Sequence, residues 1–190
     1  DASERAADLT RQMLAYAGQG AFTLVRLDLS TSVRDTANLL RATVLKKARI
    51  EMELSADLPP IEADPGQVQQ VAMNLIINAS EAVSEGANGL IRVVTRTVHL
   101  SSDSAIQFHP ARPAPGTYVV LEVSDNGCGI PSILLNSIFD PFFTTKFTGR
   151  GLGLAAVLGI LRSRGGAIAV QTEEGVGSAF SAYFPVAGAQ

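Results

Sequence analysis

A group of glycines directly in front of an apolar helix constrains this chain more than any other feature. Residues 140–154 read DPFFTTKFTGRGLGL, and the apolar run LAAVLGIL begins at Leu154. Glycines before a helix leave backbone N–H groups uncovered, and a helix N-terminus carries partial positive charge. Lys146 and Arg150 add full positive charges to the same segment. The segment therefore predicts a phosphate site, and mobile glycines would let it close over a ligand as a lid.

Two familiar phosphate-binding motifs do not account for this segment. The chain has no GxxxxGK[ST] sequence, so it has no P-loop. GLGLAA at 151–156 fits the dinucleotide pattern G-x-G-x-x-G/A, and Glu173 follows about 20 residues later. However, the preceding DPFFTTKFTGR does not read as a buried strand, which argues against a dinucleotide-binding fold.

Composition narrows the class of protein. With 190 residues, 46% of them hydrophobic, the chain can form one domain with a proper core and a short extension. A net charge of -3 argues against a nucleic-acid partner, and no apolar stretch is long enough to cross a membrane. The single cysteine, Cys128, fits a reducing compartment. With one cysteine and only two histidines, the chain has too few of the usual zinc ligands to favour a zinc site. Because the chain starts at Asp1 without methionine, we expect a piece of a longer protein.

Hydrophobic periodicity predicts an α/β domain with one mixed sheet and helices on one face. Segment 101–116 holds three prolines and no period, so we expect a surface loop or hairpin tip there. The expected elements are strands over 22–30, 49–54, 90–100 and 117–124, helices after 30, over 65–84 and over 152–164, and a hairpin over 167–186. Ser30 or Ser32 is expected to cap the first of these helices.

The N-terminal residues predict a helix of a different kind. Apolar residues recur at spacings of four and three, which forms a heptad seam. Two heptads are too short to stand alone, so we interpret residues 1–20 as the end of a longer bundle helix and 21–190 as the domain. A helix lying on its own domain is the alternative. The seam comprises Ala2, Ala6, Leu9, Met13 and Tyr16.

The helix predicted over 65–84 has an unusual polar face. An ordinary solvated face would carry Lys and Arg, and this helix has neither. Asparagine is a poor helix former, yet Asn74 and Asn78 stand one turn apart. We therefore favour a functional cleft over a solvated face, and neutral oxygens with a carboxylate suit hydrated Mg²⁺ near phosphates. The stripe comprises Gln67, Gln70, Asn74, Asn78, Glu81 and Glu85.

A second polar group follows the strand at 117–124. Asp125 ends this strand, and Gly127 and Gly129 form a turn in which backbone can approach a ligand closely. A carboxylate at a strand end beside an apolar pocket can accept a hydrogen bond from an amino group such as adenine N6. Cys128 between the glycines is expected to be a small buried hydrophobic residue.

Taken together, these segments resemble the sensor histidine kinases, within the wider superfamily of ATPases that includes gyrase and MutL. The likeness extends over nearly the whole chain, and the phenylalanine box favours histidine kinases over gyrase-like relatives. The matching segments are NLIINASEA at 74–82 (asparagine box), DNGCGI at 125–130 (first glycine box), IFDPFFTTK at 138–146 (phenylalanine box), GRGLGL at 149–154 (second glycine box) and GSAF at 177–180, with Ser178 where Thr is common.

The resemblance implies a two-layer α/β sandwich of the Bergerat type that binds ATP and Mg²⁺. It implies that Asn78 holds Mg²⁺, that Asn74 assists near the phosphates, and that Asp125 reads the adenine amino group. Phe142 and Phe143 would anchor the lid or belong to the core. The residues implied for the adenine wall are Gly127, Gly129 and Ile130, and those for the triphosphate are Lys146, Gly149, Arg150, Gly151, Leu152, Gly153 and Leu154.

One substitution bears on the reaction. Gyrase-like ATPases have a glutamate where Asn74 stands, and that glutamate activates water. An amide cannot accept a proton, whereas a neutral imidazole needs no strong base, so Asn74 fits transfer to histidine better than hydrolysis. Glu81 lies one helical turn beyond Asn78 and could still activate water, so hydrolysis stays open.

The resemblance also implies partners. The γ-phosphoryl of ATP would pass to a histidine on a dimerisation domain of a homodimeric parent, then to a response-regulator receiver domain, in the cytoplasm and without membrane contact by this fragment. His99 and His109 do not lie on helices with acidic neighbours, so we expect this fragment to bind Mg-ATP without autophosphorylating alone. An ATP-gated interaction module with little turnover remains an alternative, as does a serine kinase of the anti-sigma type.

Overall fold

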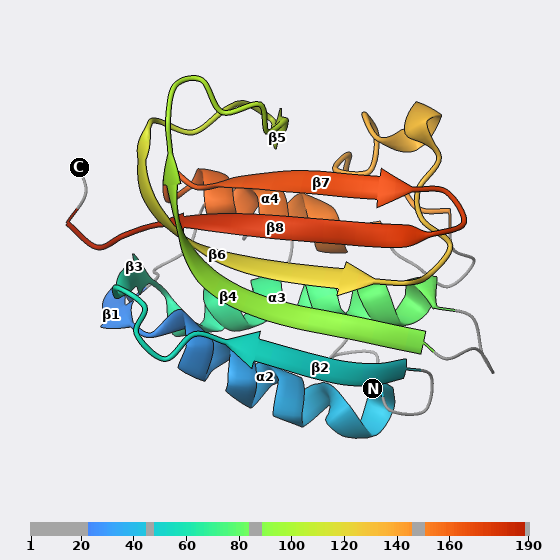
Figure 1. Ribbon diagram of the computed structural model, residues 1–190, viewed down its shortest axis with the longest axis horizontal. Helices are drawn as coiled ribbons and strands as arrows, with labels where there is room; N and C mark the ends of the chain where they lie inside the picture. Colours follow the sequence, from blue (N-terminus) through green and yellow to red (C-terminus); the bar gives the residue numbers. More distant parts are fainter. Residues whose placement is uncertain (1–22, 45–47, 84–88, 146–150, 189–190) are drawn as a thin grey trace.

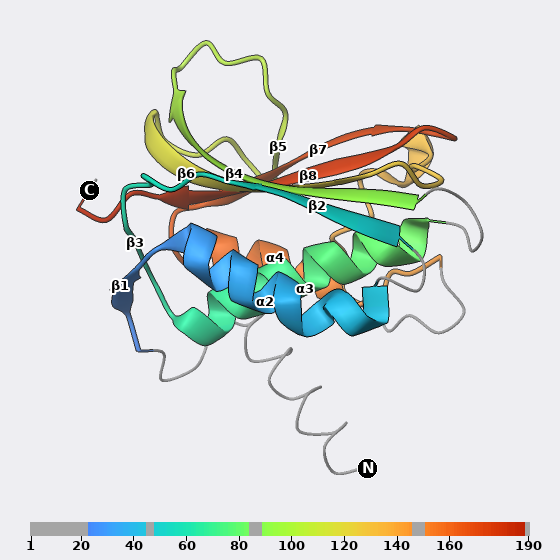
Figure 2. The ribbon, with the colours of Figure 1, turned by 60° about the horizontal axis from the view of Figure 1, so that its bottom comes forward.

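A computed structural model describes residues 23–44, 48–83, 89–145 and 151–188. Within these residues, three helices cover one face of a six-stranded mixed sheet, which confirms the predicted two-layer α/β architecture (Figures 1 and 2). The strands are β1 (Val25–Leu27), β2 (Ala48–Leu54), β3 (Ile61–Ala63), β4 (Gly89–Leu100), β5 (Phe108–His109), β6 (Gly116–Asp125), β7 (Ala167–Glu173) and β8 (Gly177–Pro185); the helices are α2 (Leu29–Val44), α3 (Pro65–Ala82) and α4 (Gly153–Arg162), with a 3₁₀ turn at Ser132–Leu134.

The order of strands in the main sheet is β2-β4-β6-β8-β7-β5. β2 runs parallel to β4, and the other neighbours are antiparallel. The last two long strands form the predicted hairpin, in which Glu173 pairs with Gly177. In this register Asp125, the last residue of β6, lies between Ile91 of β4 and Ser178 of β8. The sheet therefore holds the candidate aspartate between two neighbouring strands.

The core lies between the sheet and the helices. α3 contacts both α2 and α4, so the helix with the carboxamide stripe is the central one (Figure 2). Burying one large aliphatic side chain stabilises the folded state by roughly 1.5–3 kcal/mol. The apolar side chains between the helices and the sheet therefore fix the position of α3 against the sheet. Fully buried members include Leu75 and Ile76 of α3, Val33 of α2, Leu161 of α4, Leu121 of β6 and Ile168 of β7.

The N-terminal part of the domain differs from the prediction in two ways. The strand predicted over 22–30 is only β1, which pairs with β3 in a separate two-stranded sheet. The helix that follows is preceded by Asp28, whose Oδ1 accepts the N–H of Ser30 at 2.9 Å. The prediction of a Ser30 or Ser32 cap is therefore wrong. Ser30 is buried, and its hydroxyl donates to the carbonyl of Ser55 at 2.7 Å.

The proline-rich segment 101–116 is more ordered than predicted. It contains β5, which adds an edge strand to β7, with Phe108 opposite Ala169 (Figure 1). Phe108 also packs edge-on against Tyr183, with ring centroids 5.0 Å apart. A second apolar cluster forms here, because the segment supplies side chains that cover part of the sheet. Its buried members are Leu100, Phe108, Tyr118, Val120, Ala167, Ala169 and Tyr183. The heptad helix predicted over 1–20 lies outside the described residues.

Candidate functional site

The carboxamide stripe lies on α3, whose start is fixed by a side-chain cap. The Asp64 carboxylate accepts the N–H of Gln67 at 3.1 Å, and Pro65 occupies the first helical position. Gln70, Asn74 and Asn78 are half-buried, which places them at the border between core and surface. Gln67, which the helical angle places on the same stripe, is only 4% exposed and is therefore buried rather than at this border. Glu85, the other end of the predicted stripe, lies outside the described residues.

Asn74 and Asn78 have different surroundings although one helical turn separates them. The Nδ2 of Asn74 donates to the carbonyl of Gly153, at the start of α4, over 3.2 Å. Among the residues that the structure describes, none forms a hydrogen bond with the side chain of Asn78. The Asn78 oxygen is thus available to a ligand, and a carboxamide oxygen is a group that Mg²⁺ accepts.

Asp125 ends β6 at a turn that its own carboxylate organises. Its Oδ1 accepts the N–H of Gly127 at 2.8 Å, and the side chain is half-buried. The following residue, Asn126, accepts the N–H of Leu90 at 2.8 Å through its side-chain oxygen. The turn is therefore fastened to the first residues of β4, and the carboxylate is held in one orientation at the strand end.

Both glycines of this turn lie against backbone. A Cβ on Gly127 would overlap the carbonyl oxygen of Ala82, at the end of α3. Gly129 has φ +67°, and a Cβ there would overlap the carbonyl oxygen of Glu173. Cys128 is exposed rather than buried, which corrects the prediction, while its N–H donates to Ala82 over 3.1 Å. The glycines let this turn pack directly on α3 and on the β7–β8 hairpin.

Two hydroxyls connect this turn to the hairpin: that of Ser178, from the GSAF segment, and that of Thr172, which the sequence did not single out. The N–H of Ile130 donates to Oγ1 of Thr172 at 2.8 Å, and that oxygen lies 2.9 Å from Oγ of Ser178. Ser178 is 6% exposed and stands opposite Asp125 in the sheet. The signal that identifies Thr172 is the register of the hairpin, which the sequence alone leaves undetermined.

The second glycine segment meets the phenylalanine box. Gly151 has φ +66°, and its carbonyl accepts the N–H of Phe142 at 2.8 Å. A Cβ on Gly151 would overlap the backbone carbonyl carbon of Phe142. Phe142 itself has φ +68° and is 63% exposed, whereas Phe143 packs partly against the core. The two rings thus have different environments, and only Phe143 contributes to the core.

The structure brings part of the predicted site together. Asn74 contacts Gly153, and the turn after Asp125 contacts the end of α3, so both glycine segments border the same helix. Leu152 is buried and Leu154 is half-buried against the core. Lys146, Gly149 and Arg150 lie outside the described residues, and their predicted roles stay predictions.

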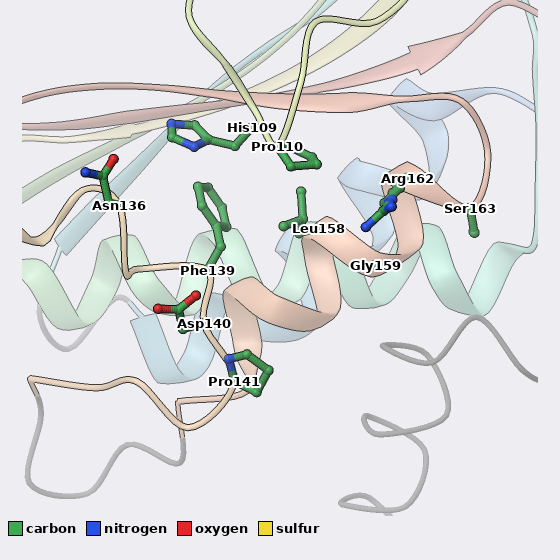
Figure 3. Close-up of a pocket in the computed structure, with 10 residues that line it drawn as sticks. All are labelled: His109, Pro110, Asn136, Phe139, Asp140, Pro141, Leu158, Gly159, Arg162 and Ser163. Carbon is green, nitrogen blue, oxygen red and sulfur yellow. The ribbon is translucent and has the colours of Figure 1, made fainter.

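A separate hollow of about 640 Å³ lies beside α4 (Figure 3). None of the predicted site residues lines it. His109 of β5 lies over Phe139, with ring centroids 5.0 Å apart, and Arg162 approaches from α4. The lining residues are His109, Pro110, Asn136, Phe139, Asp140, Pro141, Leu158, Gly159, Arg162 and Ser163.

The described part of the chain carries neither a membrane-spanning helix nor a metal-binding cluster of His, Cys, Asp and Glu. No helix there is long and apolar enough to cross a membrane. The same residues contain no group of three or more His, Cys, Asp and Glu side chains arranged to hold a metal.

Known proteins match this chain in both sequence and structure. Residues 63–188 match the family described as Histidine kinase-, DNA gyrase B-, and HSP90-like ATPase. The chain is 39% identical to the sensor kinase CckA of Brucella abortus over 96% of its own length and 19% of that protein's. It is 36% identical to the sensor histidine kinase ZraS of Escherichia coli K12, over 86% of this chain and 31% of that one.

Solved structures agree. The catalytic domain of histidine kinase ThkA has a TM-score of 0.68 and 29% identity, over 87% of this chain and 97% of that domain. Full-length ShkA in complex with AMPPNP has a TM-score of 0.71 and 28% identity, over 99% of this chain and 38% of ShkA. The chain therefore belongs to the Histidine kinase-, DNA gyrase B-, and HSP90-like ATPase family. It spans less than a third of the length of the two sequence relatives named above.

Proposed function

We propose that this domain binds Mg·ATP and transfers its γ-phosphoryl group to a histidine on a dimerisation domain outside this chain. The family supports nucleotide binding, and relatives named as sensor histidine kinases support the acceptor. The ShkA structure was solved with AMPPNP, an analogue of ATP. The observation that carries the proposal is the meeting of both glycine segments on α3. Gly153 lies beside Asn74 and Gly127 beside Ala82, and these two positions are each one helical turn from Asn78.

The adenine end of the site lies at Asp125. A carboxylate held at a strand end accepts a hydrogen bond from the adenine amino group, and the Gly127 N–H keeps it oriented. Gly127 and Gly129 bring backbone close to the base, with Ile130 beside them. Ser178, opposite Asp125, supports the same strand end.

The phosphate end lies between α3 and the start of α4. The backbone of Gly151, Leu152, Gly153 and Leu154 presents N–H groups at a helix N-terminus, which suits an anion. Lys146, Gly149 and Arg150 would complete this side. Asn78 would supply the protein's oxygen ligand to Mg²⁺, and the ion would neutralise charge on the phosphates. Asn74 lies at the same end of the site.

The transfer needs little chemistry from the domain itself. The neutral imidazole nitrogen would attack the γ-phosphorus, a nitrogen–phosphorus bond would form, and the bond to the bridging oxygen would break to release ADP. Because the nucleophile brings its own lone pair, positioning and charge neutralisation carry the rate. An amide at position 74 agrees with this chemistry, since it cannot activate water as a base.

The parent protein would supply the remaining partners. We propose a homodimer whose dimerisation helices carry the acceptor histidine, a receiver domain that takes the phosphoryl group onto aspartate, and a cytoplasmic location. Of the two histidines in the chain, His99 lies on β4 and His109 on β5, and neither occupies a helix. We therefore expect no autophosphorylation by this chain alone.

A reconstituted reaction tests the transfer. The chain is mixed with a separate dimerisation helix pair that carries His followed by Glu or Asp, in the presence of labelled Mg·ATP. We expect acid-labile label on the helix pair, lost with Asp125→Asn and kept with Asp103→Asn, a change in the exposed 101–116 segment. Tight ATP binding without label on histidine would contradict transfer and favour an ATP-gated interaction module.

A further inference from the structure

Gly151, Leu152 and Gly153 form a short backbone segment at the start of α4, which we call the strap. The carbonyl group of each of these residues accepts a hydrogen bond. The Gly151 carbonyl accepts the N–H of Phe142 at 2.8 Å, and the Leu152 carbonyl accepts the N–H of Ala156 at 2.9 Å. The Gly153 carbonyl accepts the Asn74 carboxamide at 3.2 Å. Within the described residues, no hydrogen bond is made by the N–H groups of the strap.

Peptide geometry connects these two observations. The N–H and C=O groups of a short segment cannot reorient independently, because each peptide unit is planar. The Gly151 and Leu152 carbonyls share peptide units with the N–H groups of Leu152 and Gly153, so holding these carbonyls fixes where the two N–H groups point. The Gly153 carbonyl shares its peptide unit with the N–H of Leu154. Gly153 lies in the first turn of α4, where the helical pattern pairs its carbonyl with the N–H of Val157, and the bond from Asn74 adds a connection from this carbonyl to α3.

The contact with Gly153 is close and specific. A Cβ built on Gly153 would lie 3.6 Å from Oδ1 of Asn74, so the carboxamide lies directly beside the glycine. Asn74 is half-buried on the central helix, and the two residues that directly follow it, Leu75 and Ile76, are buried in the core. Its neighbour on the stripe, Asn78, makes no such bond within the described chain. The two asparagines therefore have separate tasks.

We infer that Asn74 is a positioning residue: by binding the Gly153 carbonyl it ties the start of α4 to α3, and so holds the strap and the Leu154 N–H in position for the phosphates, without itself touching the nucleotide. The inference rests on the proposed ATP site. It assigns the metal to Asn78 alone and the orientation of the strap to Asn74. The predicted assistance of Asn74 near the phosphates thus becomes an indirect effect through one carbonyl.

Nuclear magnetic resonance measures the bond directly. A through-hydrogen-bond coupling between ¹⁵Nδ2 of Asn74 and ¹³C′ of Gly153 is recorded in the free protein and again with Mg·AMPPNP. We expect the coupling in both states. Its loss on addition of AMPPNP, while the amides of Gly127 and Gly129 shift, would show that Asn74 moves to the nucleotide and would overturn the inference. Its absence from the free protein would overturn it as well.

A variant pair gives a second readout. Asn74→Asp keeps the shape of the side chain but, when ionised, cannot donate to the Gly153 carbonyl. We expect AMPPNP affinity to fall about tenfold, as for the loss of one hydrogen bond, while adenosine affinity stays within about twofold. Asn38→Asp, on the exposed side of α2, is the matched control and should change neither.

The outcomes separate the two levels of the proposal. An Asn74→Asp protein that binds AMPPNP as tightly as the wild type would overturn the positioning role. Equal losses for adenosine and AMPPNP would also overturn it, because they would indicate general damage to the domain. If the wild-type protein binds neither ligand, the proposed function itself fails, whereas the coupling to Gly153 in the free protein can still be observed.

Discussion

Exchanging one glycine for alanine tests how the adenine wall is built. Gly129 and Gly175 both have positive φ, +67° and +80°, and both lie where the first glycine box meets the β7–β8 hairpin. A Cβ on Gly129 would overlap the Glu173 carbonyl oxygen, whereas a Cβ on Gly175 has nothing within 4 Å. The pair Gly129→Ala and Gly175→Ala therefore separates backbone strain from close packing.

The magnitudes follow from these surroundings. Left-handed backbone disfavours alanine by roughly 1–2 kcal/mol at either position. The overlap at Gly129 adds about 1–3 kcal/mol, as for overpacking elsewhere, and nothing comparable is added at Gly175. The effect of alanine on the unfolded chain is common to both variants and cancels in the comparison. We therefore expect Gly129→Ala to lose about 1–3 kcal/mol more stability than Gly175→Ala.

Urea denaturation followed by circular dichroism measures the free energy of unfolding of both variants and the wild type. For a domain of this size, each kcal/mol also lowers the melting temperature by about 2–4 °C. We expect ATP affinity to fall in Gly129→Ala and to stay near the wild-type value in Gly175→Ala. Equal losses of stability in the two variants would refute the reasoning, because they would mean that backbone strain alone decides the effect.

Three further predictions follow from the site and the core. Asn78→Ala should bind ATP with an affinity that no longer depends on Mg²⁺, whereas Asn38→Ala should keep the dependence in calorimetric titrations with and without the ion. Leu75→Ala, at a side chain that is 1% exposed, should lower the free energy of unfolding by about 2–5 kcal/mol in urea titrations. Burial raises the pKa of Tyr183, Arg96 opposes this and Glu122 reinforces it, so the folded state keeps the phenol proton longer than the unfolded state. The contribution of Tyr183 to the free energy of unfolding should therefore be constant below about pH 10 and fall as the pH rises further. The fall above about pH 10 is expected to be smaller in Tyr183→Phe, and an unchanged fall would contradict this origin.

The sequence predicted the long elements of the fold well. Alternating apolar residues fix β4, β6 and the β7–β8 hairpin, and the apolar face of α3 is buried as expected. These elements are long enough for periodicity to be read locally. The predicted α/β sandwich with helices on one face follows from them.

Other features depend on tertiary contacts that no local pattern contains. β5 has only two residues, and it forms because β7 offers a free edge. The cap at Asp28 outcompetes Ser30 because Ser30 is needed inside, where it bonds to Ser55 and Thr95. Gln67 fits the polar stripe by angle, yet its place in the first turn of α3 is buried.

The candidate site shows the same division. Asn74, Asn78 and Asp125 could be selected because their residue types are unusual for a helix interior and a strand end. The bond from Asn74 to Gly153 joins residues 79 positions apart, so only the folded chain reveals it. The contacts of Thr172 with Ile130 and Ser178 could not be predicted for the same reason, because they depend on the register of the β7–β8 hairpin.

Calorimetric titration of the chain with ATP, with and without Mg²⁺, tests the central claim most directly, with Asp125→Asn beside the wild type. We expect micromolar to sub-millimolar binding that Mg²⁺ strengthens and that Asp125→Asn abolishes in a protein still folded by circular dichroism. A folded wild-type protein that binds no ATP, or an Asp125→Asn protein that binds it equally well, would contradict the account.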